Sequence, residues 1–273
     1  MPVLETRGVS VRFGGIYANT DVSIAVGELE IVGIIGPNGA GKTTTFNVIT
    51  GFYRPDRGRV IFKGQDVTDL AVHERAALGM GRTFQNVGLV TGSTVRENLL
   101  TAQYLAADYS ILAGMLGAPA TFAVERELNQ KAEGIVEVMG LGDVLDSYVL
   151  GLPYGVLKRV EIATVLATDP EVLLLDEPSS GMGPEEAHEL GDTLLRLRRD
   201  FSISIAMIEH HVPLVVRVCD YVYCLNFGQL LAEGRPEEVR NHPQVVTAYL
   251  GEDAEDPALQ AVEGQIESLL DAE

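Results

Sequence analysis

The segment from Gly36 to Thr43 limits what this chain can fold into more than any other part of it. It reads Gly-Pro-Asn-Gly-Ala-Gly-Lys-Thr and fits the pattern G-x-x-x-x-G-K-[ST]. The residues before it, Leu29–Ile35, form an apolar, β-branched run that is typical of a buried parallel strand. A helix is expected to begin within the pattern, because a loop of this kind joins a strand to a helix. The sequence therefore predicts an α/β protein with a phosphate-binding loop.

The loop predicts ATP and Mg²⁺ as ligands. Its glycines let backbone N–H groups turn inward around phosphate oxygens, and the helix N-terminus adds positive potential. We expect Lys42 to reach the β- and γ-phosphates and the Thr43 hydroxyl to ligate magnesium. A glycine-rich turn without a chemical role is the alternative, and the strand before the loop argues against it. The residues expected to contact the nucleotide are Gly36, Pro37, Asn38, Gly39, Ala40, Gly41, Lys42, Thr43 and Thr44.

Two carboxylates follow a second apolar run, Val172–Leu175. Ligands of open α/β sheets bind at the carboxyl ends of the strands, so these side chains should lie near the phosphate loop. We expect Asp176 to hold Mg²⁺, directly or through water, and Glu177 to polarise the attacking water as a general base. Acidic residues at a strand end are often merely solvated, but their pairing with the loop favours hydrolysis of ATP.

Strand and helix patterns alternate through the second half of the chain, which indicates a mainly parallel sheet. The expected strands are Val9–Phe13, Asp21–Val26, Leu29–Ile35, Arg59–Phe62, Val172–Leu175, Ile203–Ile208, Tyr221–Asn226 and Gln229–Ala232. Besides the helix after the phosphate loop, the expected helices are Thr94–Ala107, Val124–Met139, one from Val156 to about Asp169, and Pro184–Arg199.

The net charge of −19 argues against a nucleic-acid partner, because phosphate backbones are bound by clustered Lys and Arg. Part of this charge lies in the tail, residues 252–273, which holds eight acidic residues and no basic one. We predict that Pro257–Glu273 forms an amphipathic helix docked on the folded body of the protein, with disorder as the alternative. The apolar face of that helix would consist of Leu259, Val262, Ile266 and Leu269 or Leu270.

No segment predicts a membrane span or a secretory signal. The longest uncharged stretch, Tyr109–Val124, is shorter than the roughly 20 apolar residues that cross a bilayer, and Gly and Pro interrupt it. The start of the chain, Met1–Phe13, lacks a basic region followed by an apolar run. We therefore expect a protein that stays in the cytoplasm.

Further residues occur in the order in which the ATP-binding cassette (ABC) family carries them, and the chain resembles that family from about Leu4 to Gly251. Gln85 matches the family glutamine that senses magnesium and the attacking water and faces the membrane subunits. His210, directly after an apolar strand, matches the switch histidine that contacts the γ-phosphate. The resemblance thus implies that Gln85 and His210 are catalytic, and that Gln85 is also a metal contact.

The resemblance also implies an adenine-stacking residue near the N-terminus. Phe13 matches the aromatic residue that stacks on adenine in the family, with Tyr17 as its rival. A lone Phe belongs more often to the core of a protein than to a ligand site.

The signature segment departs from the family pattern. The family reads Leu-Ser-Gly-Gly-Gln where this chain reads Leu-Pro-Tyr-Gly-Val over Leu152–Val156. In the family, the serine hydroxyl touches the γ-phosphate of the ATP held by the opposite subunit, whereas Pro153 has neither a hydroxyl nor an N–H. The N-terminus of the following helix remains as an anion site. The Asp expected after Glu177 is also replaced, by Gly183, and both departures argue against equal hydrolysis at two symmetric sites.

Within the family, the local sequence resembles the ATP-binding subunits of branched-chain amino-acid uptake systems. The matching segments are Gly81–Gln85, Thr94–Leu99 and Ala248–Gly251, and Ala106–Arg126 looks like the insertion of that group. Urea and amide uptake ATPases and the lipopolysaccharide-export ATPase carry similar phrases. The transported solute is therefore implied by the resemblance and by no single residue.

The resemblance implies an ABC ATP-binding domain over residues 1–251. It should have a parallel-sheet core, an antiparallel β-layer and a helical subdomain over about residues 88–160. The implied partners are a second cassette, identical or different, membrane permease subunits and indirectly a solute-binding protein, at the cytoplasmic face of the membrane. Two alternatives remain. A soluble cassette acting on DNA or ribosomes would carry a coiled-coil insertion or two cassettes, and a P-loop kinase would need an acceptor-substrate site.

Overall fold

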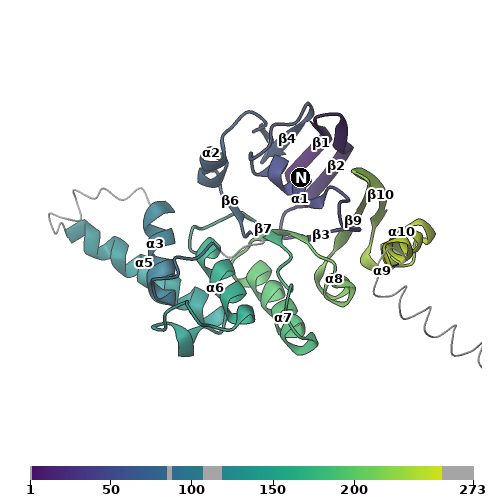
Figure 1. Ribbon diagram of the computed structural model, residues 1–273. Coiled ribbons are helices and arrows are strands. Elements are labelled where there is room, and N and C mark those ends of the chain that lie inside the picture. The colour runs from purple at the N-terminus through teal and green to yellow at the C-terminus, as the bar shows by residue number, and fades with distance from the viewer. Residues whose placement is uncertain (1, 85–87, 107–118, 254–273) are drawn as a thin grey trace, which may run out of the picture.

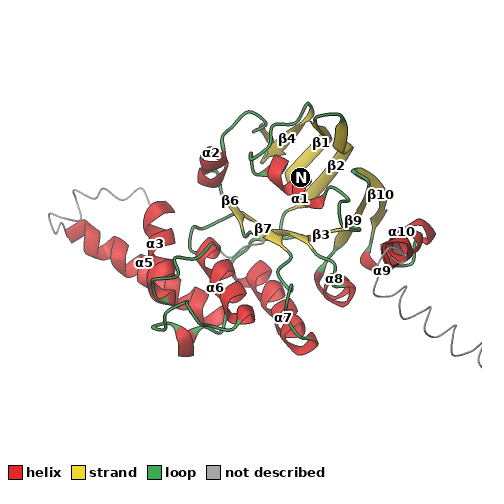
Figure 2. Ribbon diagram, in the orientation of Figure 1, coloured by secondary structure: helices red, strands yellow, loops and turns green. Residues whose placement is uncertain are grey.

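The computed structural model describes residues 2–84, 88–106 and 119–253, which form two sheets and a set of flanking helices (Figure 1). Figure 2 shows the antiparallel strands on one side of the central sheet and the helices α6, α7 and α8 on the other. These helices span Tyr154–Leu166, Pro184–Asp200 and Val212–Val218.

The central sheet has six strands in the order β10-β9-β3-β8-β7-β6, and every neighbouring pair from β9 to β6 is parallel. Its three middle strands are buried along their whole length, which explains their continuous apolar sequences. The strands are β3 (Ile31–Ile35), β6 (Met80–Arg82), β7 (Val172–Asp176), β8 (Ser204–Ile208), β9 (Tyr221–Asn226) and β10 (Gln229–Gly234).

A second, antiparallel sheet has the order β2-β1-β4-β5. Two long strands, β1 (Pro2–Phe13) and β2 (Ile16–Gly27), form a hairpin, and β4 (Arg57–Phe62) and β5 (Gln65–Asp66) extend it. Both long strands exceed the predicted segments, because irregularities in their pairing interrupt the alternation of buried and exposed residues without ending the strands.

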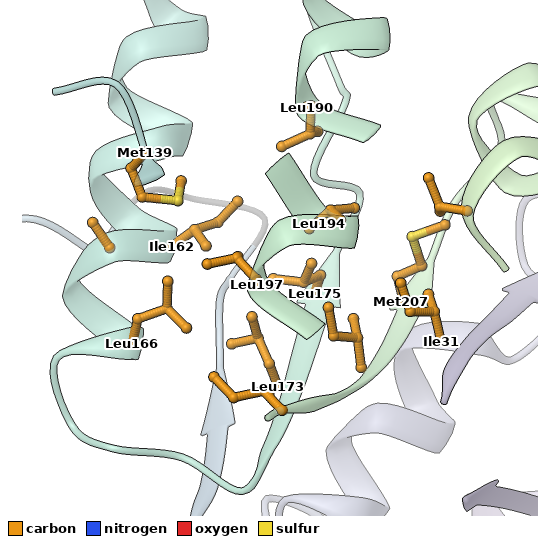
Figure 3. Packing of buried hydrophobic residues seen from close by; sticks show 14 of the residues in the cluster. Ile31, Met139, Ile162, Leu166, Leu173, Leu175, Leu190, Leu194, Leu197 and Met207 are labelled. Carbon is orange, nitrogen blue, oxygen red and sulfur yellow. The ribbon is translucent and has the colours of Figure 1, made fainter. Parts of the chain in front are cut away.

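The core lies on both faces of the central sheet. Helix α1 (Lys42–Ile49) packs between the two sheets, where Phe46 is fully buried. On the opposite face, leucines of β7 meet leucines of α7, and α6 closes the same cluster (Figure 3). Successive residues of β7 alternate between the two clusters: Leu173 and Leu175 join the helical side, whereas Val172 and Leu174 join the α1 side.

A helical region projects from one end of the central sheet (Figure 1). It contains α3 (Val95–Ala106), α5 (Pro119–Val138), the short helix η1 (Gly142–Val144) and α6. These helices fall within the predicted range of about 88–160, except that α6 runs on to Leu166 and joins the core. Within the part of the chain that the structure describes, no helix is both long enough and apolar enough to cross a membrane.

Several short elements were not predicted from the sequence. Most of them are too brief to show a hydrophobic period, and β6 is only three residues long. The unpredicted elements are α2 (Val72–Ala77), β5, β6, η1, α8, α9 (Pro236–Arg240) and α10 (Pro243–Asp253). The predicted helix of the tail, Pro257–Glu273, lies outside the described residues.

Candidate nucleotide-binding site

Three groups of predicted site residues lie at the carboxyl ends of three adjacent strands, β3, β8 and β7. The register aligns Ile34 with Ile208 and Ile208 with Asp176, so the three strands end at the same edge. The loops that leave them carry the phosphate loop, His210 and Glu177, respectively. Residues more than 100 positions apart in sequence are thus brought together by the parallel pairing.

Two glycines give the phosphate loop its shape. Gly36 has φ 143°, and a Cβ there would lie 2.1 Å from the Leu225 carbonyl oxygen. Gly41 has φ 95°, and a Cβ there would lie 2.6 Å from the Ala18 carbonyl oxygen. Both positions combine a left-handed backbone with a close approach to another strand, so only glycine fits them.

Lys42 is buried within the loop, and its ammonium faces backbone oxygens. Its Nζ donates to the carbonyls of Gly36 at 2.6 Å and Pro37 at 2.8 Å. The following residue, Thr43, is exposed, and both lie in the first turn of α1. A pocket of about 250 Å³ opens here, lined by Ala18, Asn38, Gly39, Ala40, Gly41, Lys42, Thr43, Thr44 and Glu177. The loop and Glu177 therefore share one pocket.

The two carboxylates after β7 differ in environment. Glu177 is half-buried, has φ 48°, and its N–H donates to the Ile208 carbonyl at 3.0 Å. This unusual backbone conformation turns the chain sharply after the strand and places Glu177 in the pocket wall. Asp176 is only 3% exposed. It does not contribute to that wall.

Asp176 has a partner that the sequence did not predict. Nη2 of Arg82 lies 3.1 Å from Oδ2 of Asp176, and both side chains are buried. Burial lowers the pKa of Arg82 below its ordinary value, and the hydrogen bond to Asp176 opposes that shift. The other terminal nitrogen of the guanidinium, Nη1, donates to Asn47 on α1 and to Thr50 just after it. Arg82 therefore ties the carboxylate to the helix that follows the phosphate loop.

Gln85 lies outside the described residues, but Phe84, directly before it in the sequence, is well defined. Both backbone polar groups of Phe84 are held by α6: the N–H donates to Glu161 at 2.8 Å, and the carbonyl accepts from Lys158 at 3.0 Å. Lys158 and Glu161 are buried and pair with each other at 3.2 Å. Burial raises the pKa of Glu161, and hydrogen bonds from Phe84 and Lys158 oppose that change. Phe84 is thus held by hydrogen bonds to α6, the helix that follows the signature segment.

His210, the second residue after β8, is exposed, whereas Glu209 before it is fully buried. The neighbouring His211 is half-buried at the start of α8, and its Nδ1 is shielded from solvent. Of the adjacent histidines, His210 is therefore the one presented at the strand edge.

The two aromatic candidates for adenine stacking lie on either side of the β1–β2 turn. Phe13 is 48% exposed and packs edge-on against Tyr53 with 5.1 Å between ring centroids. Tyr17 is 54% exposed, with Arg12 over its ring. Neither belongs to the wall of the phosphate-loop pocket, and the choice of Phe13 stays a prediction.

The signature segment leads into α6 with Pro153 at the N-cap position. No side chain caps the helix, and α6 begins at Tyr154, two residues earlier than predicted. Tyr154 is 41% exposed. Gly183, which replaces the expected Asp, is the N-cap of α7, and its N–H donates to Glu186 at 3.0 Å.

The C-terminal helix α10 also reaches the phosphate loop. The N–H of Gly36 donates to the hydroxyl of Tyr249 at 2.8 Å. In the sequence, Tyr249 stands only within the family-like segment Ala248–Gly251, because nothing in a local pattern indicates a contact across 213 positions.

The residues present fit a nucleotide with Mg²⁺. The glycines at positions 36 and 41 leave a cradle that a Cβ would fill, and the Lys42 ammonium suits phosphate oxygens. The Thr43 hydroxyl and the Asp176 carboxylate offer oxygen ligands, the type of ligand that Mg²⁺ prefers.

Comparison with known proteins gives a consistent result. Residues 19–180 match the family model described as ABC transporter, and residues 229–255 match one described as branched-chain amino acid ATP-binding cassette transporter. The chain is 42% identical over 251 residues to the high-affinity branched-chain amino acid transport ATP-binding protein LivG of Salmonella typhimurium, covering 92% of this chain and 98% of that protein. It is 41% identical, with the same coverage, to the corresponding protein BraF of Pseudomonas aeruginosa.

Solved structures show the same likeness. The ADP conformation of an ATP-binding cassette of an ABC transporter superposes with a TM-score of 0.80 at 35% identity, covering 92% of this chain and 100% of that one. A nucleotide-free ATP-binding cassette from an ABC transporter gives a TM-score of 0.78 at 35% identity, covering 91% and 99%.

Proposed function

The chain belongs to the ABC transporter family, and from this premise we propose that it powers the uptake of branched-chain amino acids by hydrolysing ATP with Mg²⁺. One observation carries the proposal: the phosphate loop and Glu177 line a single pocket at the edge of the parallel sheet. The amino-acid class is supported by the names of relatives at 41–42% identity and by the match over residues 229–255.

We assign the residues of this pocket separate roles in hydrolysis. Lys42 and the loop N–H groups bind and orient the phosphates, and Glu177 takes a proton from the attacking water at a carboxylate oxygen. His210, exposed in the loop that follows β8, contacts the γ-phosphate in this proposal, and Gln85 senses Mg²⁺ and the attacking water. When bound, Mg²⁺ offsets charge on the phosphate oxygens, and Thr43 and Asp176 would hold it.

The partners follow from the same premise. We propose that the chain pairs with a second cassette and docks on permease subunits at the cytoplasmic face of the membrane. A solute-binding protein would deliver the solute to those permease subunits. Exposed aromatic residues support a docking surface: Phe52 and Phe84, the latter directly before Gln85 in the sequence, are 49% and 42% exposed, with ring centroids 5.8 Å apart. Arg82 lies within 5.8 Å of both rings and links this surface to Asp176.

The direct test is uptake in cells that carry the complete transporter with this chain either intact or as Glu177→Gln. We expect leucine, isoleucine or valine uptake to fall with the variant while the assembled complex still purifies with its membrane subunits. Urea, amide or lipopolysaccharide transport that falls instead would replace the amino-acid assignment. Formation of a phosphorylated product in place of free phosphate would indicate a kinase, and purification without membrane proteins would indicate a soluble cassette.

A further inference from the structure

Glu209 is a buried carboxylate that the roles above do not use. It follows the last residue of β8 and precedes His210, and its side chain is completely shielded from solvent. Among the ion pairs of the described residues, none includes Glu209. A buried charge is costly unless it is compensated, so the groups around this carboxylate need an explanation.

Backbone and hydroxyl donors from two loops surround the carboxylate. Oε1 accepts from the N–H of Ser179 at 2.9 Å and from its hydroxyl at 2.5 Å. Oε2 accepts from the N–H groups of His210 at 2.8 Å and His211 at 2.9 Å. One oxygen therefore holds the loop that follows Glu177, and the other holds the backbone that carries the His210 ring.

The same strand ends are joined by backbone bonds. Glu209 donates its own N–H to the Ile34 carbonyl at 3.3 Å, and Glu177 donates its N–H to the Ile208 carbonyl at 3.0 Å. The strand that leads into the phosphate loop, the proposed general base and His210 thus share a hydrogen-bonded frame with Glu209 inside it. Loss of one acceptor leaves a buried N–H unpaired, so the frame is sensitive to a single atom.

We propose that Glu209 is a positioning residue for ATP hydrolysis: it fixes the His210 backbone against the Ser179 loop and so sets the distance from His210 to Glu177. This inference rests on the role proposed above for His210. Glu209 acts through that histidine and touches neither phosphate nor water itself.

The substitution Glu209→Gln tests the proposal while keeping the size of the side chain. An amide has one NH₂ group, which must face either the Ser179 N–H or the two histidine N–H groups, and a donor cannot pair with a donor. We expect kcat to fall about tenfold or more, because a displacement of about 1 Å can cost up to 10²-fold. KM for ATP and the affinity for ADP should stay within about twofold, since the phosphate loop is unchanged.

A double-mutant cycle in the assembled transporter separates positioning from general damage. Because Glu209 acts through His210, Glu209→Gln should reduce kcat by less than about twofold in a His210→Ala background. Ser179→Ala removes only the hydroxyl donor, and it should give a smaller loss that also vanishes in that background. If Glu209→Gln does not fold, this second cycle decides the question.

The matched control is Asp220→Asn, at the opposite end of the sheet. Oδ2 of Asp220 accepts from the Ile31 N–H at 2.8 Å and pairs with Arg198, so the same change of carboxylate to amide loosens a strand end remote from the pocket. It should lower stability and leave kcat unchanged. Equal fractional losses from Glu209→Gln with and without His210 would overturn the positioning role. An unaltered kcat in His210→Ala alone would instead overturn the role proposed for His210.

Discussion

The phosphate loop and the signature segment lie in different parts of this ATPase, and they differ in the groups that each offers to a nucleotide. The loop has two glycines that no other residue could replace, a buried Lys42 and a brace from Tyr249. The signature segment enters α6 through Pro153, which offers neither an N–H nor a hydroxyl, and no side chain caps the helix. The comparison indicates a chain that is well equipped to hold ATP and poorly equipped to complete a site for a partner.

This difference predicts that the two ATP sites of a cassette pair hydrolyse ATP at different rates. The prediction takes from the family resemblance that each ATP lies between the phosphate loop of one subunit and the signature segment of the other. A partner with a complete signature would furnish the site on Lys42 fully. The site facing Pro153 would lack a donor. One charge-assisted hydrogen bond contributes about 1.5–3 kcal/mol, or roughly ten- to a hundredfold in occupancy or rate.

The largest expected effect is on the loop side. Glu177→Gln should bind ATP but turn it over at least about a hundredfold more slowly, because general-base catalysis contributes roughly 10²–10⁴-fold. Steady-state phosphate release and ATP binding measure the two quantities. The control is Glu171→Gln, which changes an exposed carboxylate just before the first residue of β7, the strand that Glu177 follows. This variant should hydrolyse ATP normally. Turnover close to that of the unmodified chain would remove Glu177 from the mechanism.

Lys42→Ala should weaken nucleotide binding itself by roughly ten- to a hundredfold, since a charge-assisted phosphate contact is lost. A titration with ATP and Mg²⁺ gives the dissociation constant directly. Lys63→Ala removes an exposed lysine that pairs with Glu171 and should leave the constant unchanged. Unchanged affinity in Lys42→Ala would contradict the proposed phosphate contact.

A gain of function is expected on the signature side. The purified chain should hydrolyse ATP feebly, because a homodimer would place Pro153 across both sites. Pro153→Ser supplies a hydroxyl and an N–H at a position where serine also favours helix formation, and it should raise hydrolysis about tenfold. Pro153→Ala supplies the N–H alone and separates the two donors. If neither variant is faster, Tyr154 or the helix N-terminus already supplies the contact.

The smallest effect is expected from the brace on the loop. Tyr249→Phe leaves the buried Gly36 N–H without its acceptor, which should cost about 1–3 kcal/mol of unfolding free energy. Chemical denaturation measures this loss. Tyr223→Phe is matched, because the Tyr223 hydroxyl accepts the Ala25 N–H at 3.1 Å, away from the loop. Only Tyr249→Phe should also weaken nucleotide binding, and equal affinities for the two variants would make the brace purely structural.

Much of this architecture could be predicted because the informative segments are local. The order of Gly36–Thr43, Val172–Glu177 and His210 along the chain predicted a P-loop ATPase of the ABC type, which the fold and the structural relatives confirm. The middle strands were found because burial on both faces leaves a continuous apolar sequence. The roles assigned to individual site residues stay predictions.

The contacts between distant segments could not be predicted. Arg82 lay within a recognised phrase, yet only the register of β6 and β7 shows that it meets Asp176. Glu209 carries one signal, an acidic residue directly after an apolar strand, which is the same pattern that marks Asp176 and Glu177 as candidates. Lys158 and Glu161 share a helix face, but their grip on Phe84 depends on tertiary packing.

The asymmetry is tested most directly in a transporter reconstituted from this chain, a second cassette that carries Leu-Ser-Gly-Gly-Gln, and the membrane subunits. The measurement compares ATP turnover in Glu177→Gln with turnover when the equivalent glutamate of the second cassette is changed. We predict the greater loss from Glu177→Gln, because the site on this chain's Lys42 meets the complete signature. Equal losses from the two variants would contradict the account.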